Sequence, residues 1–449
     1  MNRWTLHVTD FGKIKQADVQ VAPMTLFLGD NNSGKSYLMT LIYGLLNLKI
    51  AFWGFEFDKQ STTYKTCRDM LKDVLDKMDS VYKLSFSLTQ EQIAMFEQLL
   101  NSVLQKNQRV FLRQLFNREV EAGEITIHFP ESSAYSFEIE SVNYENKGMY
   151  IIYGKSENRD NILGCGLEQD KIAEDDYCFL LSYIMEFMLK SEFQDMADTN
   201  TVFFPTARTG YLLTYRSLVQ NAMQEMFSEK ETIKNLLTRP NTDFLTMLSS
   251  MRTDKKNDMY ADIVCFIEQQ LIKGNILVSD LPTHEVMYVP EGNDKQLPMY
   301  MSSGVVTELA PLVLFLKYKK LGTLLIEEPE IGLHPELHVE MARLLIRIKN
   351  AGTPVFVTTH SDIIIQHINN MMRLAKSDNN EKIFQRYGFE EEDIIHQGDV
   401  AVYQFDVQDD ARTVVSRVAC GDYGFEARTF YNTLEKINNL IMDIDNLEE

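Results

Sequence analysis

Two hydrophobic patterns alternate along the chain, one typical of buried strands and one typical of helices. Short apolar runs at residues 24–28, 323–326 and 354–358 have the length of buried strands. Residues 37–46 form a longer apolar stretch, which predicts a buried helix soon after the first of these runs. Strands that alternate with helices in this way indicate an α/β fold.

The segments between these runs have weaker hydrophobic patterns, which still predict helices and strands. Residues 62–118 are mostly helical in pattern, with a capping box formed by Thr89 and Gln92. The other expected elements are a hairpin at 4–9 and 17–22, strands at 124–129, 135–142 and 149–153, a helix at 174–195, a strand at 201–204, helical residues 211–273, and short strands within 276–301 around a hairpin turn at 291–294.

The most specific motif lies between the run at 24–28 and the helix at 37–46. It reads Gly29, Asp30, Asn31, Asn32, Ser33, Gly34, Lys35 and Ser36, and it fits the phosphate loop G-x-x-x-x-G-K-[ST]. The two glycines allow the loop to curl, so that backbone N–H groups and the helix N-terminus face an anion. Lys35 is expected to reach the β- and γ-phosphates of a nucleotide, and the Ser36 hydroxyl to bind Mg²⁺.

Two adjacent carboxylates, Glu327 and Glu328, end the apolar run at 323–326. Carboxylates at the end of a buried strand are costly unless they serve a cation or polarise a water. We assign Glu327 to Mg²⁺ through a water ligand, and Glu328 to the general base that orients the attacking water.

A histidine, His360, ends the run at 354–358 and is predicted to contact the γ-phosphate and the attacking water. His334 and His338 have the spacing of a metal-binding pair, but no third ligand follows them, so a metal site is not expected there.

The sequence predicts a helix start at Ser302, Ser303 and Gly304, where Ser303 is the expected N-cap and free N–H groups can face an anion. Together, the four motifs stand in the order of an ABC-type ATPase: phosphate loop, Ser-Ser-Gly signature, acidic strand and strand-end histidine. The chain therefore resembles the non-transporter ABC ATPases of the RecF/SMC/OLD class. The likeness is strongest over residues 1–55 and 201–370, including Phe-Pro-Thr-Ala-Arg-Thr-Gly at 204–210.

The resemblance implies an ABC-type P-loop ATPase head, with a mixed central sheet, an antiparallel β lobe and helical insertions. The predicted boundaries are 1–58 for the N-terminal lobe with the phosphate loop, 59–120 for a helical insertion, 121–210 for the β lobe and the return to the head, 211–275 for a second helical insertion, 276–375 for the C-terminal lobe, and 376–449 for a small C-terminal α/β extension.

The resemblance also implies a dimer closed around ATP, in which Ser303 and Gly304 of one copy cap the γ-phosphate bound by Lys35 of the other.

Several positions depart from the family pattern. Glu327 replaces the common Asp, Pro311 is expected to bend the signature helix, and the glutamine loop is unassigned. The role of Arg208 stays open between nucleotide sensing, partner contact and structure.

Composition narrows the function further. The formal net charge of −21 argues against a protein that wraps nucleic acid, although it leaves room for a local basic groove. The cluster Lys106, Arg109, Arg113 and Arg118 is either such a contact or a solvated helix face. The five cysteines are scattered and no apolar run has the length of a membrane span, so we expect a cytoplasmic protein.

Two functions remain after these considerations. Only about 89 residues follow His360, too few for the Toprim nuclease of OLD proteins, so an intrinsic nuclease is not expected. By analogy, the chain is predicted to be the sensor or switch ATPase of an anti-phage defence complex, which controls a separately encoded nuclease or toxin. The alternative is a DNA-repair or DNA-clamping ATPase similar to SMC and RecF proteins.

Overall fold

The structure of this chain is a computed structural model that describes residues 4–50, 54–144, 147–155, 165–168, 172–191, 200–215, 237–279, 285–377, 380–426, 438–442 and 444. Among the helices in these ranges, none is both long enough and apolar enough to cross a membrane. Several predictions lie partly outside the described residues, among them the end of the helix at 174–195, residues 280–284 of the stretch 276–301, residues 216–236 of the second insertion, and most of the tail after 426.

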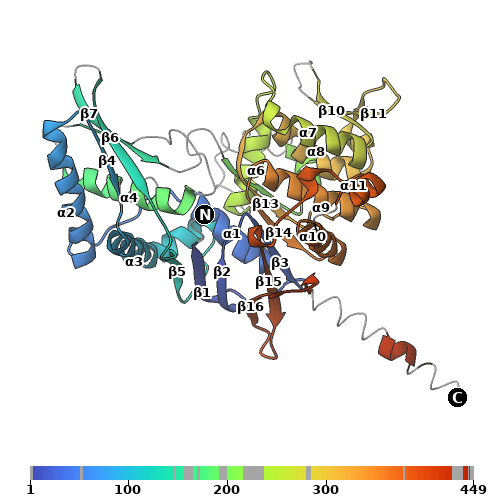
Figure 1. The fold of residues 1–449 in the computed structure, drawn as a ribbon, viewed down its shortest axis with the longest axis horizontal. Coiled ribbons are helices and arrows are strands. Elements are labelled where there is room, and N and C mark those ends of the chain that lie inside the picture. Colours follow the sequence, from blue (N-terminus) through green and yellow to red (C-terminus); the bar gives the residue numbers. More distant parts are fainter. Residues whose placement is uncertain are drawn as a thin grey trace, which may run out of the picture.

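A mixed sheet of nine strands runs through the middle of the molecule, in the order β5-β1-β2-β16-β15-β3-β14-β13-β9 (Figure 1). The run from β15 to β9 is parallel throughout, whereas β1 pairs antiparallel with β2 and β5, and β15 antiparallel with β16. The nine strands are β1 (Thr5–Phe11), β2 (Ile14–Gln20), β3 (Met24–Gly29), β5 (Ile125–His128), β9 (Asn200–Phe204), β13 (Leu321–Glu327), β14 (Val355–Thr359), β15 (Val400–Val407) and β16 (Thr413–Arg417).

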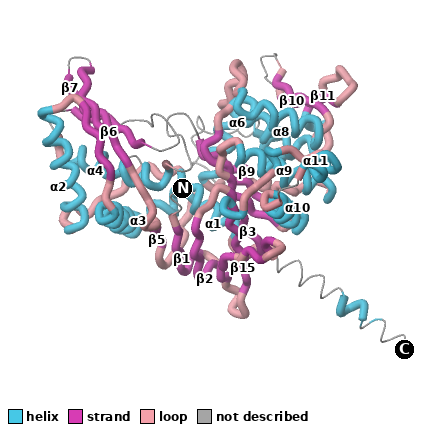
Figure 2. Tube along the Cα trace, in the orientation of Figure 1, coloured by secondary structure: helices cyan, strands magenta, loops and turns pink. Residues whose placement is uncertain are grey.

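Two hydrophobic cores cover opposite faces of this sheet, because successive side chains of a strand point to opposite sides. On β3, Phe27 packs into one core, whereas Leu26 and Leu28 pack into the other. The first core includes side chains of α1, α3 and α4, and the second those of α8, α9 and α10. Figure 2 shows the strands of the sheet between these two groups of helices.

Helix α1 begins and ends close to its predicted position, the predicted helical stretch 62–118 is divided into α2 and α3, and α8 continues past Pro311. They are α1 (Lys35–Leu46), α2 (Thr62–Asp76), α3 (Gln90–Phe116), α4 (Glu174–Lys190), α6 (Arg239–Ser249), α7 (Ala261–Phe266), α8 (Gly304–Tyr318), α9 (Pro335–Asn350), α10 (Asp362–Leu374) and α11 (Glu381–Tyr387). The capping box of Thr89 and Gln92 at the start of α3 is confirmed.

A separate antiparallel sheet, in the order β4-β6-β7-β8, lies beside α2 and α4 (Figure 1). The predicted fold class, an α/β head with a mixed central sheet and an antiparallel β lobe, is therefore confirmed. The remaining strands are β4 (Lys83–Ser87), β6 (Ser136–Tyr144), β7 (Lys147–Lys155), β8 (Cys165–Glu168), β10 (Gly274–Val278), β11 (Val286–Pro290), β12 (Leu297–Pro298), β17 (Cys420–Gly421) and β18 (Gly424–Phe425).

Strand β4 interrupts residues 62–118, which are otherwise mostly helical as expected. Lys83, Ser85 and Ser87 alternate with Leu84 and Phe86, which is the period of a half-buried strand. The ring of Phe86 stacks on Phe137 of β6 with centroids 5.4 Å apart. Pairing with β6 and this ring contact outweigh the helical pattern of the flanking residues.

The C-terminal strands β15 and β16 lie in the middle of the central sheet, between β2 and β3. This differs from the prediction that residues 376–449 form an extension outside the head. The Tyr403 hydroxyl of β15 donates a hydrogen bond of 2.9 Å to the Gln20 carbonyl and accepts one of 2.8 Å from the Gln20 N–H. Strands β15 and β16 therefore complete the head. They do so through contacts between residues 383 positions apart, which no local sequence pattern reveals.

Because His367 on α10 is buried, we expect the folded state to lose stability in acid. Burial, together with the charge of Arg343, lowers its pKa to about 4, against an ordinary value near 6.5. As pH falls from 6.5 towards 4, the unfolded chain gains a proton here that the folded chain does not, so stability is lost in that window. The loss attributable to this residue is about 3 kcal/mol.

The measurement is the melting temperature of the wild type and of His367→Gln at pH 7 and pH 4.5. The wild type is expected to lose several more degrees on acidification than the variant, which has no imidazole to protonate. Equal losses in both proteins would show that His367 is not the source of the acid sensitivity.

Candidate functional site

The phosphate loop predicted from the sequence connects β3 to α1. Gly29 and Gly34 have φ angles of 145° and 101°, which residues with a side chain rarely adopt. A Cβ atom on Gly29 would lie 2.8 Å from the carbonyl oxygen of Phe405 on β15, so a larger residue does not fit there. Asn31 and Asn32 are exposed in the turn between the glycines. The loop thus has the tight curl that a phosphate cradle requires.

Lys35, the first residue of α1, places its ammonium group inside this loop. Its Nζ donates hydrogen bonds of 2.8 Å to the carbonyl oxygens of Gly29 and Asp30, and lies 3.5 Å from Ser33 Oγ. Burial lowers the pKa of Lys35 to about 8, although nearby carboxylates, above all Glu328, act in the opposite direction. The first turn of α1 has no acidic residue. An anion at the loop would meet both the lysine and the positive end of the helix.

Three parallel strands bring the other predicted residues to the same edge of the sheet. Thr359 of β14 lies opposite Leu28 of β3, and Glu327 of β13 lies opposite Thr358 of β14. The chain leaves each strand at this edge. The phosphate loop, the two glutamates and His360 are therefore neighbours in space, as the sequence predicts.

Glu328 and His360 form the central pair of this edge. Oε1 of Glu328 lies 3.4 Å from Nε2 of His360, and this contact lowers the pKa of Glu328 against the effect of its partial burial. The Glu328 N–H donates a 2.8 Å hydrogen bond to the Thr358 carbonyl. Its φ of 41° lies in the left-handed region, where a glutamate is strained. An ionised carboxylate in this position can orient a water molecule or accept its proton.

Glu327 is held by groups in the turn that follows the neighbouring edge strand, β9. Its Oε2 accepts hydrogen bonds from the N–H of Thr206, at 3.3 Å, and from the Thr206 hydroxyl, at 3.1 Å. Glu327 is only 7% exposed, and a buried carboxylate held by neutral donors favours a nearby cation. Ser36 is exposed on the first turn of α1. A hydroxyl and a carboxylate are ligands that Mg²⁺ prefers, so these two residues fit the predicted metal.

Glu330 also belongs to this edge, although the sequence alone assigns it no role. Its Oε1 accepts hydrogen bonds from the Thr359 hydroxyl, at 2.7 Å, and from the His360 N–H, at 2.6 Å. Its buried Oε2 has no hydrogen-bond partner among the described residues. Glu330 fixes the backbone that carries His360, and its presence in the Glu-Glu-Pro-Glu sequence was the available signal.

The predicted signature lies at an open helix N-terminus. Ser303 is the N-cap of α8, and its side chain makes no capping hydrogen bond. Ser303 and Gly304 are exposed, and a Cβ on Gly304 would meet nothing within 4 Å. Tyr300 and Met301, just before them, are 76% and 62% exposed. Among the described residues, hydrogen bonds connect this turn to Thr307 of its own helix and not to the phosphate loop.

His334 and His338 each contact the start of a helix. His334 is the N-cap of α9 and its Nδ1 accepts a 3.5 Å hydrogen bond from the Glu336 N–H. Nδ1 of His338 lies 2.8 Å from the hydroxyl of Ser361, the N-cap of α10. Both histidines therefore have structural positions beside the site.

The basic cluster on α3 and the turn after it is partly neutralised. Arg109 Nε lies 2.9 Å from a carboxylate oxygen of Glu119, and Lys106 Nζ lies 3.5 Å from one of Glu56. Ion pairs of this exposed kind are typical of a solvated helix face. The contacts favour that interpretation of the cluster over a nucleic-acid surface.

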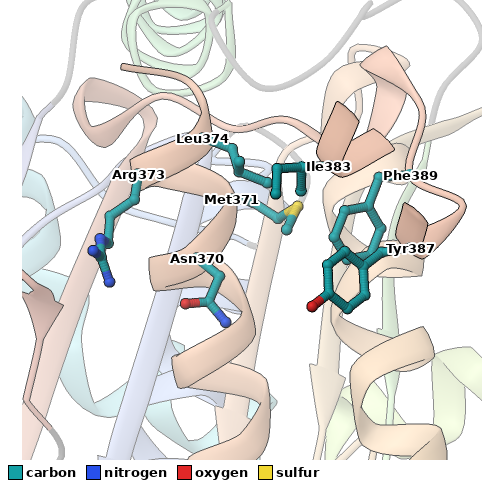
Figure 3. A pocket seen from close by; sticks show the side chains of 7 residues that line it. All are labelled: Asn370, Met371, Arg373, Leu374, Ile383, Tyr387 and Phe389. Carbon is teal, nitrogen blue, oxygen red and sulfur yellow. The ribbon is translucent and has the colours of Figure 1, made fainter. Parts of the chain in front are cut away.

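A hollow of about 490 Å³ lies apart from this edge, beside α10 and α11 (Figure 3). The rings of Tyr387 and Phe389 stack in it with centroids 5.8 Å apart. It shares no residue with the phosphate loop or the acidic strand end, so it is not part of the candidate site. Its lining residues are Asn370, Met371, Arg373, Leu374, Ile383, Tyr387 and Phe389.

Comparisons with solved structures return heads of SMC proteins at 11% identity. The SMC head domain from Thermotoga maritima has a TM-score of 0.33, with 93% of this chain and 100% of that chain covered. An SMC head bound to the C-winged helix domain of ScpA has a TM-score of 0.35, with 92% and 97% covered. An Smc head with an extended coiled coil, bound to the C-terminal domain of ScpA derived from Pyrococcus furiosus, has a TM-score of 0.33, with 98% and 100% covered.

The sequence comparisons give one family match and no curated relative. The AAA ATPase domain family matches residues 4–365, a range that includes the phosphate loop, the signature, both glutamates and His360. This range is most of the 449 residues, and the chain belongs to the AAA ATPase domain family.

Proposed function

We propose that this chain binds ATP with Mg²⁺ at the phosphate loop and hydrolyses it to ADP and phosphate. The observation that carries the proposal is the shared sheet edge. It holds a buried Lys35 inside a curled loop and an ionised Glu328 in contact with His360. These are the positioning and water-orienting groups that phosphoryl transfer requires.

The residues divide the reaction between them. Lys35 exchanges its bonds to the loop carbonyls for bonds to the phosphate oxygens of the nucleotide. Glu328 orients the attacking water and accepts its proton, while His360 contacts the γ-phosphate. Ser36 and, through a water, Glu327 would hold Mg²⁺, which supplies neutralisation of the charge on the phosphate oxygens.

The same proposal includes a second copy of the chain. The exposed N-terminus of α8 offers free N–H groups and an uncommitted Ser303 hydroxyl, which suit the outer face of a γ-phosphate. The phosphate loop of one copy and Ser303 of the other would then enclose each ATP. Binding of ATP closes the dimer of two heads, and hydrolysis of ATP allows the dimer to open.

The biological role proposed for this switch is that of a sensor subunit in an anti-phage defence complex. Closure and opening would control a separate effector, a nuclease or a toxin. The support is the resemblance to the OLD-like ATPases. Co-purification with the product of a neighbouring gene tests this role, and a chain that stays alone would contradict it.

The DNA-clamping alternative predicts ATP-dependent DNA binding that weakens as the salt concentration rises. Filter binding at low salt would detect this binding.

Lys35→Ala is the direct test of the ATP site. The variant is expected to lose at least about 100-fold in affinity for Mg–ATP, because charge-assisted bonds to two phosphates disappear. Titration calorimetry and phosphate release give the affinity and the turnover. Lys382→Ala, at an exposed position on α11, serves as the matched control. Turnover at the wild-type rate in Lys35→Ala would contradict the proposal.

A further inference from the structure

Arg208 is a buried charge beside the candidate site, at the start of the helical residues 208–215 that follow β9. It is 2% exposed and ranks among the largest fully buried side chains. This burial excludes direct contact with a partner protein. A guanidinium held away from water is costly unless its donors are all engaged, so the identity of its partners indicates its role.

The guanidinium joins two elements that belong to different parts of the ATP site. Nη1 donates a 2.8 Å hydrogen bond to the carbonyl of Glu327, and Nη2 donates one of 3.2 Å to the carbonyl of Glu328. Nε lies 2.9 Å from Oε2 of Glu308, on the second turn of α8. The Thr209 hydroxyl donates a 2.6 Å hydrogen bond to the other oxygen, Oε1, of Glu308. The acidic end of β13 is thereby connected to the signature helix.

The backbone that Arg208 contacts is strained. Glu328 has a φ of 41°, a conformation that costs a residue with a side chain of order 1 kcal/mol or more and persists only where neighbours enforce it. The two carbonyls that flank this residue's N–H and Cα are both acceptors of Arg208. A planar fork of donors can hold two carbonyls at once, which a lysine ammonium cannot do with the same geometry.

We propose that Arg208 is a positioning residue for hydrolysis. It holds Glu328 in the left-handed conformation that directs its carboxylate towards His360, and it fixes this strand end relative to α8 through Glu308. The inference rests on the proposed function, in which Glu328 orients the attacking water and α8 caps the partner's nucleotide. This positioning role differs from the three that the sequence left open, and it also accounts for the hydrogen bond between Thr209 and Glu308.

The test combines Arg208→Lys with Glu328→Gln. Arg208→Lys is expected to lower kcat by about 10- to 100-fold, with KM for ATP and the affinity for Mg–ATP unchanged, because only the water-orienting group is displaced. In the Glu328→Gln background, the same substitution is expected to cause no further loss, since the group that it positions is already gone. A purely structural role would lower turnover by the same factor in both backgrounds.

Arg343→Lys is the matched control for loss of a buried arginine. Arg343 is 7% exposed and pairs with Asp393 at 2.8 Å and Glu340 at 2.9 Å, in contacts that do not include the site. It is expected to lower the melting temperature and leave kcat unchanged. Should Arg208→Lys fail to fold, Glu308→Gln, which keeps the shape of the carboxylate and removes its charge, is scored by the same criteria.

The outcomes separate this inference from the proposed function. If Glu328→Gln slows turnover but Arg208→Lys does not, or if the two losses multiply in the double variant, the positioning role is overturned and the ATPase proposal stands. If Glu328→Gln leaves turnover unchanged, the assignment of the base itself is overturned.

Discussion

Glu328→Gln is expected to reduce steady-state ATP turnover by about 10²- to 10⁴-fold while ATP binding is retained, the usual effect of losing a general base. Glutamine has the same shape and keeps the fold of the strand end, but it cannot accept a proton from water. The contact with His360 lowers the pKa of Glu328, so the wild-type carboxylate is ionised at neutral pH and ready for this role. Phosphate release under saturating ATP measures the effect.

The variant should also accumulate the closed dimer. If ATP joins two heads and only hydrolysis separates them, blocking hydrolysis shifts the population towards the ATP-bound dimer. Light scattering or native mass measurements with and without ATP will show this shift. Glu121→Gln, an exposed carboxylate in the loop before β5, is the control for charge loss alone. Unchanged turnover in Glu328→Gln would show that another group activates the water.

The local parts of the site were predictable because their signals lie within single segments. The phosphate loop combines a strand, two glycines, a lysine and a helix start within 29–36 and its flanks. Glu327, Glu328 and His360 follow directly from their own apolar strands. Since parallel strands end at one edge, a local assignment of each strand was sufficient to place these residues together.

The parts that escaped prediction depend on contacts between distant segments. Strands β15 and β16 enter the sheet between β2 and β3, which depends on hydrogen-bond register and not on composition. Apart from the carbonyl of Pro205, the partners of Arg208 lie 100 to 120 positions further along the chain, so three roles remained open for it. Thr206 and Glu330 stand inside recognised motifs, yet only the fold shows which atoms they hold.

Ser303→Arg is expected to abolish ATP-dependent dimerisation and to lower turnover by about 100-fold or more, while single heads still bind ATP. The position is exposed at the N-terminus of α8, so a large side chain is accommodated in the monomer. In the closed dimer it would occupy the place of the partner's γ-phosphate, and overpacking at the centre of an interface costs several kcal/mol. Ser303→Ala is the control for the hydroxyl, because that hydroxyl does not cap its own helix.

Mixing two inactive variants separates a shared site from a site within one chain. Ser303→Arg retains an intact phosphate loop, and Lys35→Ala retains an intact signature, so a mixed dimer contains one complete site if Ser303 acts on the partner's nucleotide. The introduced arginine then faces a loop that holds no nucleotide, and closure is not opposed. An equal mixture is expected to recover up to about half of wild-type turnover, since neither variant closes with itself and each mixed dimer has one of two complete sites. If Ser303 acted on the nucleotide of its own chain, neither variant could complete the other, and the mixture would be as inactive as its components.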